Sequence, residues 1–124
     1  MTDIDFPADR IVLDCVALEC RDPVALAQFY HEITGWPITR TDPDWYEVSG
    51  GSIILAFQLA PAYAPPTWPD PRSSMQSHLD FNVVNIDAAE ARVLAAGAVK
   101  FDHQPGDHYR VYADPAGHPF CLCT

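Results

Sequence analysis

Two halves of this chain repeat one order of local signals, and this repetition limits the possible folds more than any other feature. Cys15 and His78 lie 63 positions apart, and so do Gln58 and Cys121. The first pair lies in extended runs that precede a helix signal, and the second pair ends the last apolar run of each half. The spacing predicts a duplicated module whose equivalent strands bring these four polar side chains together.

Helix signals in the first half are local and strong. Asp22 and Pro23 are suited to a helix start, because Asp accepts hydrogen bonds from free N–H groups and Pro has no N–H to satisfy. Gly35 supplies a stop at the other end. Extended segments around this helix are predicted at 11–20, 36–40, 45–48 and 52–59.

The second half repeats this order. Its first strand places His78, Asp80 and Asn82 on one face, because side chains alternate along a strand. Asp87 and Glu90 then form a capping-box signature for a helix that a glycine closes. Extended segments are predicted at 77–84, 98–102, 108–113 and 119–123. Each half therefore reads β-α-β-β-β, and the predicted fold class is α+β.

A proline-rich stretch separates the halves. The sequence predicts one domain over 1–124, with a first module at about 10–59, a connecting loop at 60–76 and a second module at 77–124. Prolines deny the loop sheet and helix hydrogen bonds. The loop also carries Tyr63 and Trp68. It is either a lid over a pocket or a linker held to the surface by these aromatic side chains.

Charge and composition exclude several kinds of partner. A net charge of −10 repels phosphate backbones and anionic lipids, so we expect no nucleic-acid and no membrane partner. Residues 1–7 lack the basic and apolar parts of a signal peptide, which favours a cytoplasmic location. In that compartment the four cysteines are expected to be free thiols.

Three motifs, in this order and spacing, resemble those of a known superfamily. They are the run DPVALAQFY at 22–30 with Gly35 after it, HLD at 78–80, and YADPAGHPF at 112–120. The chain resembles the vicinal oxygen chelate (VOC) superfamily, which includes glyoxalase I, bleomycin-resistance proteins and extradiol dioxygenases. Within it, the chain is most similar to small glyoxalase-like domain proteins. The resemblance implies paired βαβββ modules that form a curved mixed sheet around a central cup, often completed by a second subunit, so we expect a homodimer.

The resemblance also implies a metal in the cup, held by the positions that match Cys15, Gln58, His78 and Cys121. These four residues include no carboxylate, and Cys121 stands where the resemblance places a catalytic glutamate. We therefore favour a pocket without a metal and leave catalysis, and any catalytic residue, open. The alternative is a divalent metal (zinc, nickel or manganese) in a lyase or isomerase of the VOC type, since two thiolates suit a soft ion.

Further pocket candidates share the strand faces or are aromatic. Glu19 and Asn82 are themselves 63 positions apart and are predicted to line the cup, with Glu19 as a general base or as an acid paired with Arg21. Trp68 and Tyr109 are suited to contact a flat ligand, although core packing explains them equally well. The remaining histidines of the second half are expected to be solvated turn residues: His103, His108 and His118.

The favoured function is therefore that of a glyoxalase-like protein that binds a small organic molecule, aromatic or apolar, in a central cup. Two alternatives stay open. One is the metal-dependent lyase or isomerase, and the other is a dimeric module with a vestigial pocket that acts through protein partners.

Overall fold

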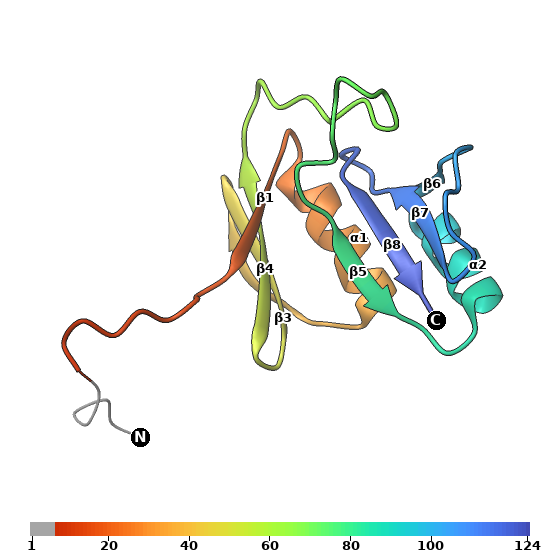
Figure 1. The fold of residues 1–124 in the computed structure, drawn as a ribbon. Coiled ribbons are helices and arrows are strands. Elements are labelled where there is room, and N and C mark those ends of the chain that lie inside the picture. Colours follow the sequence, from red (N-terminus) through yellow and green to blue (C-terminus); the bar gives the residue numbers. More distant parts are fainter. Residues whose placement is uncertain (1–6) are drawn as a thin grey trace.

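Each half of the chain folds into a module with its own sheet and helix (Figure 1). The computed structural model describes residues 7–124. The first module contains β1 (Val16–Cys20), α1 (Pro23–Thr34), β2 (Ile38–Asp42), β3 (Trp45–Gly50) and β4 (Ile53–Leu59). The second contains β5 (Leu79–Asn82), α2 (Ile86–Ala96), β6 (Val99–Lys100), β7 (Tyr109–Ala113) and β8 (Pro119–Cys123). The predicted α+β class and the paired βαβββ modules are confirmed.

The two sheets have the same topology. Their strand orders are β1-β4-β3-β2 and β5-β8-β7-β6. In each sheet the first strand runs parallel to the last strand, and the other neighbours are antiparallel. The parallel pair is possible because the helix after the first strand returns the chain to the starting end of the sheet. β1 and β5 are consequently edge strands of their sheets.

Both helices begin at an Asx side chain, but not both as predicted. The Asp22 carboxylate accepts a hydrogen bond from Ala25 N at 3.1 Å, as expected for a cap. In α2 the Asn85 side chain accepts from Ala88 N at 3.0 Å, so the predicted cap at Asp87 is wrong. Asp87 lies in the first helical turn instead, where its carboxylate accepts from Arg110 at 2.9 Å. The helix therefore begins two residues earlier than the capping-box pattern suggested.

The first extended segment is shorter than predicted. Residues 11–15 are not part of a strand, and β1 begins at Val16, which pairs with Leu55 of β4. The preceding residues leave the body of the protein as an arm (Figure 1), with Ile11 96% and Leu13 83% exposed. The apolar character of this segment made it resemble a strand, but no neighbouring strand is present to pair with it within the described residues.

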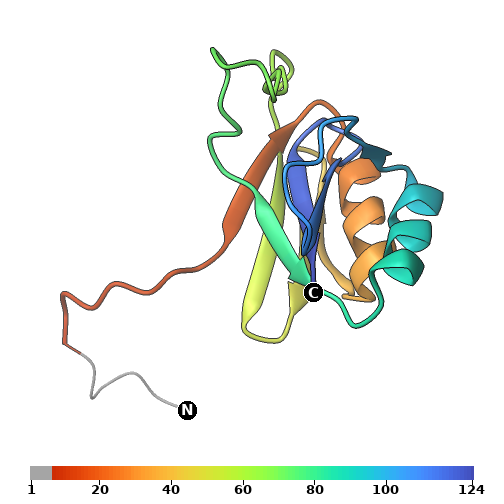
Figure 2. The same cartoon turned by 45° about the vertical axis from the view of Figure 1, so that its right-hand side comes forward.

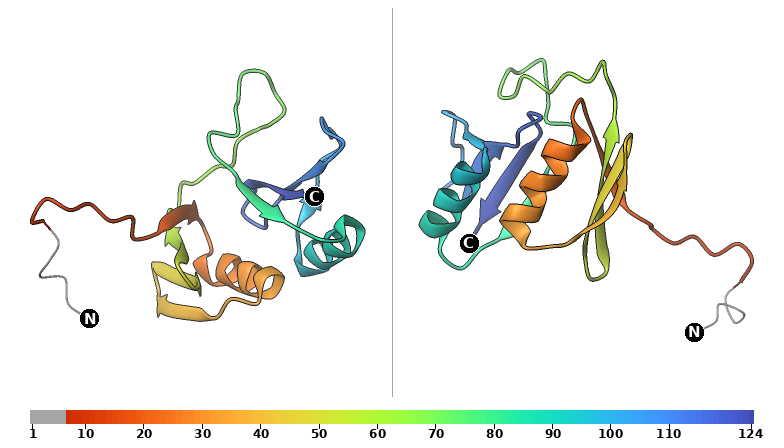
Figure 3. Two further views of the ribbon diagram at one scale, coloured as in Figure 1. Left: turned by 60° about the horizontal axis from the view of Figure 1, so that its bottom comes forward. Right: turned by 180° about the vertical axis from the view of Figure 1, so that it is seen from behind.

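An aromatic cluster joins the two modules. Tyr30 on α1 stacks on Phe57 of β4 at 5.5 Å and lies 6.4 Å from Phe81 of β5. Phe29, its neighbour on α1, lies 5.8 Å from Phe120 of β8. Figure 2 shows α1 beside α2, and the right-hand view of Figure 3 shows α1 between α2 and the first sheet. α1 thus contributes core contacts to both sheets.

The proline-rich loop lies across one end of the molecule (Figure 1) and is held there by its aromatic side chains. Tyr63 stacks on His118 with ring centroids 4.9 Å apart, and Trp68 meets Phe101 edge-on at 5.0 Å. The Arg21 guanidinium also donates to the Tyr63 carbonyl oxygen at 2.9 Å. The loop is therefore fixed to both modules by specific contacts.

The structure bears on only one of the expectations about location. Over residues 7–124, no helix is long and apolar enough to cross a membrane. The signal-peptide expectation depends mainly on residues 1–6, which lie outside the described residues.

Candidate ligand-binding site

Strand register decides which of the predicted site residues meet. Glu19 of β1 pairs with Gln58 of β4, so an equal spacing in both halves would pair Asn82 with Cys121. Asn82 instead pairs with Cys123, and Cys121 pairs with Asp80. The second parallel pair has therefore slipped by two residues relative to the first. The expectation that equal spacing brings four equivalent side chains together is wrong in this respect.

The slip does not change which side chains are buried. Side chains alternate with a period of two along a strand, so a shift of two residues returns every side chain to the same face. Leu79 and Phe81 stay packed against the core, while Asp80 and Asn82 stay exposed. Hydrophobic burial cannot distinguish the two registers, and neither can a sequence pattern that is based on burial.

A large cavity lies between the modules and has a volume of about 790 Å³. β1 and β4 form one wall, β5 and the β7–β8 turn form another, and the proline-rich loop closes the end. Three predicted candidates line this main cavity: Glu19, Gln58 and His78. The rest of the wall is mostly apolar and includes Leu18 and Met75.

A second cavity of about 490 Å³ lies over the second sheet. The predicted residues Trp68, Tyr109 and Cys121 line it, together with His78, which borders both cavities. Trp68 reaches the second cavity from the loop and lies 5.4 Å from the His103 ring. The predicted site is thus divided into two adjoining cavities that share one imidazole.

The two remaining candidates lie elsewhere. Asn82 borders a smaller cavity of about 250 Å³ beside α1 and α2, with Trp36 and Arg92. Cys15 precedes β1, is half-buried and lines neither the main nor the second cavity. Burial raises the pKa of the Cys15 thiol, with Asp14 and Glu47 adding to the effect. Neither residue shares a cavity with Gln58.

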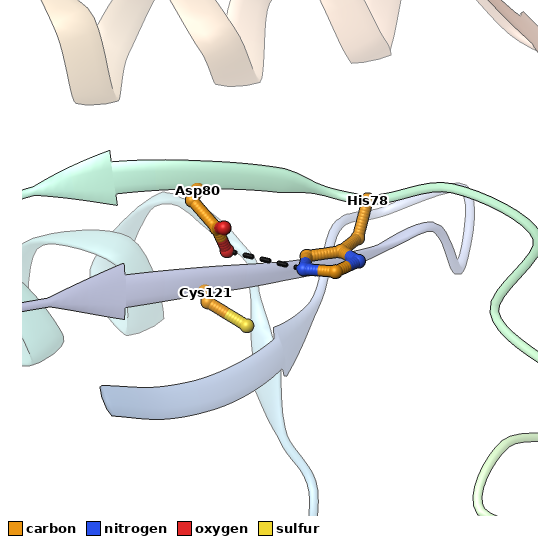
Figure 4. A group of neighbouring side chains, drawn as sticks. All are labelled: His78, Asp80 and Cys121. Carbon is orange, nitrogen blue, oxygen red and sulfur yellow. Dashed lines mark ion pairs between the residues drawn. The ribbon is translucent and has the colours of Figure 1, made fainter. Parts of the chain in front are cut away.

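Register slippage creates one cluster that the sequence did not predict. The ligand-type atoms of His78, Asp80 and Cys121 all lie within 4.8 Å of one another (Figure 4). His78 Nε2 lies 3.2 Å from Asp80 Oδ1. Burial and the neighbouring Asp80 raise the pKa of the Cys121 thiol to about 12. The carboxylate that was missing from the predicted quartet is therefore supplied by Asp80, which pairs directly with Cys121.

The cluster offers a donor set that fits a metal of borderline softness. One imidazole, one carboxylate and one thiolate are all ligands of zinc, and three protein ligands leave a position for a further group. Because a thiol coordinates as the thiolate, metal binding would release the Cys121 proton. Gln58 and Cys15 do not belong to this cluster.

His118 was expected to be a solvated turn residue, and that expectation is wrong. Its side chain is only 15% exposed, lines the main cavity and packs on Tyr63. Nδ1 lies 3.0 Å from Oδ2 of Asp114, whose side chain is fully buried. The motif at 112–120 held the signal, because an Asp four residues before a His in a tight turn can fold back onto it. Met75 left no such signal, since it comes from a loop without regular structure, whereas Tyr63 was marked by its aromatic side chain on a possible lid.

The chain was compared with protein-family models, curated proteins and solved structures. A protein-family model described as a glyoxalase-like domain matches residues 11–123. No curated protein matches the chain. Among solved structures, a glyoxalase/bleomycin resistance protein/dioxygenase family enzyme from Burkholderia phytofirmans is 22% identical with a TM-score of 0.67, covering 86% of this chain and 93% of that chain.

Two further structures are similar at comparable length. A glyoxalase/bleomycin resistance protein from Albidiferax ferrireducens is 18% identical with a TM-score of 0.65, covering 90% of this chain and 96% of that chain. The fosfomycin resistance protein FosX from Mesorhizobium loti is 16% identical with a TM-score of 0.69, covering 91% of each chain. At these identities the likeness is one of fold.

Proposed function

This chain belongs to the glyoxalase-like domain family, and from that premise we propose that its main cavity binds a small apolar or aromatic organic molecule. The observation that supports this most directly is the cavity itself, about 790 Å³ in volume. A volume in this range, with apolar walls and a few polar groups, is typical of small-molecule sites. The polar groups here include Glu19, Gln58, His78 and His118, and the loop adds serine hydroxyls and the Gln76 amide.

Charge narrows the class of ligand. The protein carries a net charge of −10, and Glu19 adds a carboxylate to the cavity wall. Both features disfavour an anionic ligand. Tyr63 offers an aromatic side chain at the loop end of the cavity, next to the His118 ring. An uncharged molecule with a flat ring and one or two hydrogen-bonding groups fits this wall best.

A cavity-filling substitution tests binding. Ala17 is exposed, lies on β1 and lines the main cavity, so Ala17→Phe would occupy part of its volume. The neutral fluorescent probe N-phenyl-1-naphthylamine should brighten on binding to the wild-type protein. We expect its affinity to fall at least tenfold in Ala17→Phe and to stay unchanged in Ala91→Phe, a matched change on the exposed face of α2. No binding by the wild-type protein, or equal affinity in both variants, would refute the proposal.

A metal-dependent lyase or isomerase is the second candidate, and the cluster of His78, Asp80 and Cys121 favours it. These three residues would hold a divalent ion such as zinc, nickel or manganese, which would supply Lewis-acid polarisation of an oxygen atom on the ligand. His78 also borders the main cavity, so such an ion would lie at its edge.

Metal titration of protein purified without a histidine tag tests the second candidate. Calorimetry should give one ion per chain for the wild-type protein, with release of about one proton from the Cys121 thiol at pH values well below its pKa. Cys121→Ser and His78→Ala should each weaken binding at least tenfold, whereas Cys15→Ser should not. Equal binding by all four proteins, or no binding by the wild-type protein, would argue against a metal enzyme.

We also propose that the chain pairs with a second copy. The support is the arm at residues 11–13, where three consecutive apolar side chains are exposed. If a dimer forms and no small molecule binds, the remaining candidate is a dimeric module that acts through protein partners.

A further inference from the structure

The turn between β7 and β8 holds a buried carboxylate that is surrounded by donors. Asp114 is 3% exposed and accepts hydrogen bonds from the Tyr30 hydroxyl at 2.7 Å and from the backbone N–H groups of Ala116 and His118 at 2.9 and 3.0 Å. The His118 ring supplies a fourth contact, with Nδ1 at 3.0 Å from Oδ2 and 3.2 Å from Oδ1. Two elements, α1 and the turn, therefore fix the carboxylate.

This arrangement determines the tautomer of the neutral His118 ring. A carboxylate accepts hydrogen bonds and donates none, so Nδ1 must carry the proton in its contact with Asp114. The other ring nitrogen, Nε2, is then an acceptor with a free lone pair. Over residues 7–124, Nε2 of His118 has no hydrogen-bond partner.

The ring is held at the wall of the main cavity. Tyr63 of the loop stacks on it at 4.9 Å with an angle of 27° between the ring planes. His118, Tyr63 and Tyr30 all line the cavity, and Glu19 lies on the β1 side of the same cavity. Burial raises the pKa of Tyr63 to about 12, with Asp114 adding to the effect, so this hydroxyl stays protonated near neutral pH. A histidine oriented by a buried carboxylate and facing a ligand cavity is an arrangement suited to general-base work.

We propose that His118 Nε2 is the proton acceptor for an acidic hydroxyl group, phenolic or enolic, on the molecule bound in the main cavity, and that Asp114 is its positioning residue. This inference depends on the proposed binding function. In the transfer, the O–H bond of the ligand breaks, its proton moves to Nε2, and the electron pair stays on the ligand oxygen. The resulting imidazolium lies against the Asp114 carboxylate, which stabilises its charge.

The charged and titratable groups around His118 come from five parts of the chain. Asp114 lies in the same turn, Tyr30 approaches from α1, Tyr63 from the loop and Glu19 from β1. His78 of the strand region before β5 also lines the cavity. Among these groups, Asp114 is the one whose contact selects the position of the His118 proton.

The chromophore 4-nitrophenol tests the transfer, because its phenolate absorbs visible light and its phenol does not. At a pH just below the pKa of the free probe, binding to the wild-type protein should increase the phenolate fraction. His118→Gln should still bind the probe, as measured by equilibrium dialysis, but the bound phenolate fraction should fall at least tenfold. Asp114→Asn should also lower it, since an amide can donate to Nδ1 and leave the proton on Nε2. His108→Gln, a change of an exposed histidine, should match the wild type.

Separate outcomes distinguish the two proposals. If the wild-type protein binds neither 4-nitrophenol nor N-phenyl-1-naphthylamine, the binding function fails and the transfer fails with it. If the wild-type protein binds 4-nitrophenol in its phenol form, or if the bound phenolate fraction is unchanged in His118→Gln, the role of His118 is refuted while the binding function stands. Long-range proton–nitrogen NMR on the wild-type protein gives a check that needs no variant. It should show the neutral His118 ring protonated on Nδ1, and protonation on Nε2 would overturn the inference.

Discussion

At the scale of single residues, Asp114 is the buried polar group whose hydrogen bonds connect the most parts of the fold. Its carboxylate connects α1 to the β7–β8 turn through Tyr30, the only contact of this kind between Asp114 and a helix in the described chain. Removing the carboxylate leaves several buried donors unsatisfied, whereas removing the Tyr30 hydroxyl leaves Asp114 with its other donors. The two residues therefore differ in their expected contributions to stability.

This difference gives the first prediction. Tyr30→Phe should lower the free energy of unfolding by about 2 kcal/mol, the usual loss for a hydrogen bond to a charged group. Asp114→Ala should lower it by about 4 kcal/mol, because it also exposes backbone donors to an apolar interior. The double variant should lose less than the sum, since both residues share one bond. Urea unfolding measures all three, and equal losses in the single variants would contradict the assignment.

Thiol burial leads to a second prediction, on pH. Burial raises the pKa of Cys20 to about 11 and that of Cys121 to about 12. The unfolded chain releases these protons from about pH 9, so the folded state then binds more protons than the unfolded state. The stability associated with the neutral thiols is present below about pH 9 and is lost as the pH rises towards 11–12.

Urea midpoints in reducing buffer should therefore fall between about pH 8.5 and 10. The slope approaches about 1.4 kcal/mol per pH unit for each thiol that is ionised only when unfolded. Cys20→Ala should flatten this dependence while costing some stability at neutral pH through lost packing. A stability that is constant over this range would show that the thiols ionise freely in the folded protein.

At the scale of elements, the contact between Gly117 and the proline-rich loop positions a cavity wall. Gly117 has a φ of +94°, and a Cβ added there would lie 2.5 Å from Cβ of Pro65. Both the backbone conformation and the space at this position require glycine. Tyr63, two residues before Pro65, is the loop residue that packs on His118.

Gly117→Ala should therefore both destabilise the protein and displace the loop. Gly51→Ala is the matched control, because Gly51 also has a positive φ of +71° but a Cβ there meets nothing within 4 Å. Each variant should lose about 1 kcal/mol from backbone strain. Only Gly117→Ala should lose more than this and also show faster proteolysis within 60–76. Equal effects of both variants would mean that Pro65 does not constrain the turn.

Elements were predictable from the sequence where their signals are local. The bounds of α1 follow from Asp22 and Gly35, and β8 occupies the predicted residues, because caps and alternation depend only on neighbouring positions. The slip between β5 and β8 was not predictable, since a two-residue shift keeps the same faces buried. The cluster at Asp80 follows from that slip. Glu19, Gln58 and His78 were found as lining residues of one cavity, but the separation of Trp68, Tyr109 and Cys121 into a second cavity was not predicted.

At the scale of the whole molecule, the exposed arm has no equivalent in the second module. Ile11, Val12 and Leu13 are 96%, 61% and 83% exposed, and Val16 and Ile53 extend the apolar surface onto the sheet at 40% and 52%. Contiguous apolar surface of this kind is typical of protein interfaces. A second copy that covers the arm would bury these side chains.

The double variant Ile11→Asp/Leu13→Asp should therefore shift the protein from dimer to monomer, because a dimer interface would have to bury two new charges. Val84→Asp is the control, since Val84 is fully exposed and lies between β5 and α2 of the second module. Sedimentation equilibrium gives the mass of each protein. A monomeric wild-type protein, or a dimer that persists in the double variant, would refute pairing through the arm.

The proline-rich loop has a consequence for how ligand preference can evolve on this fold. It supplies Tyr63, Met75 and much of the remaining wall of the main cavity. None of the residues at 60–76 belongs to the hydrophobic core, which is built from the helices, the sheets and their flanking turns. Substitutions in this segment can therefore reshape the ligand space with little loss of folding free energy. Ligand preference and fold stability are encoded in largely separate parts of the sequence, so new specificities can evolve here without first requiring a more stable protein.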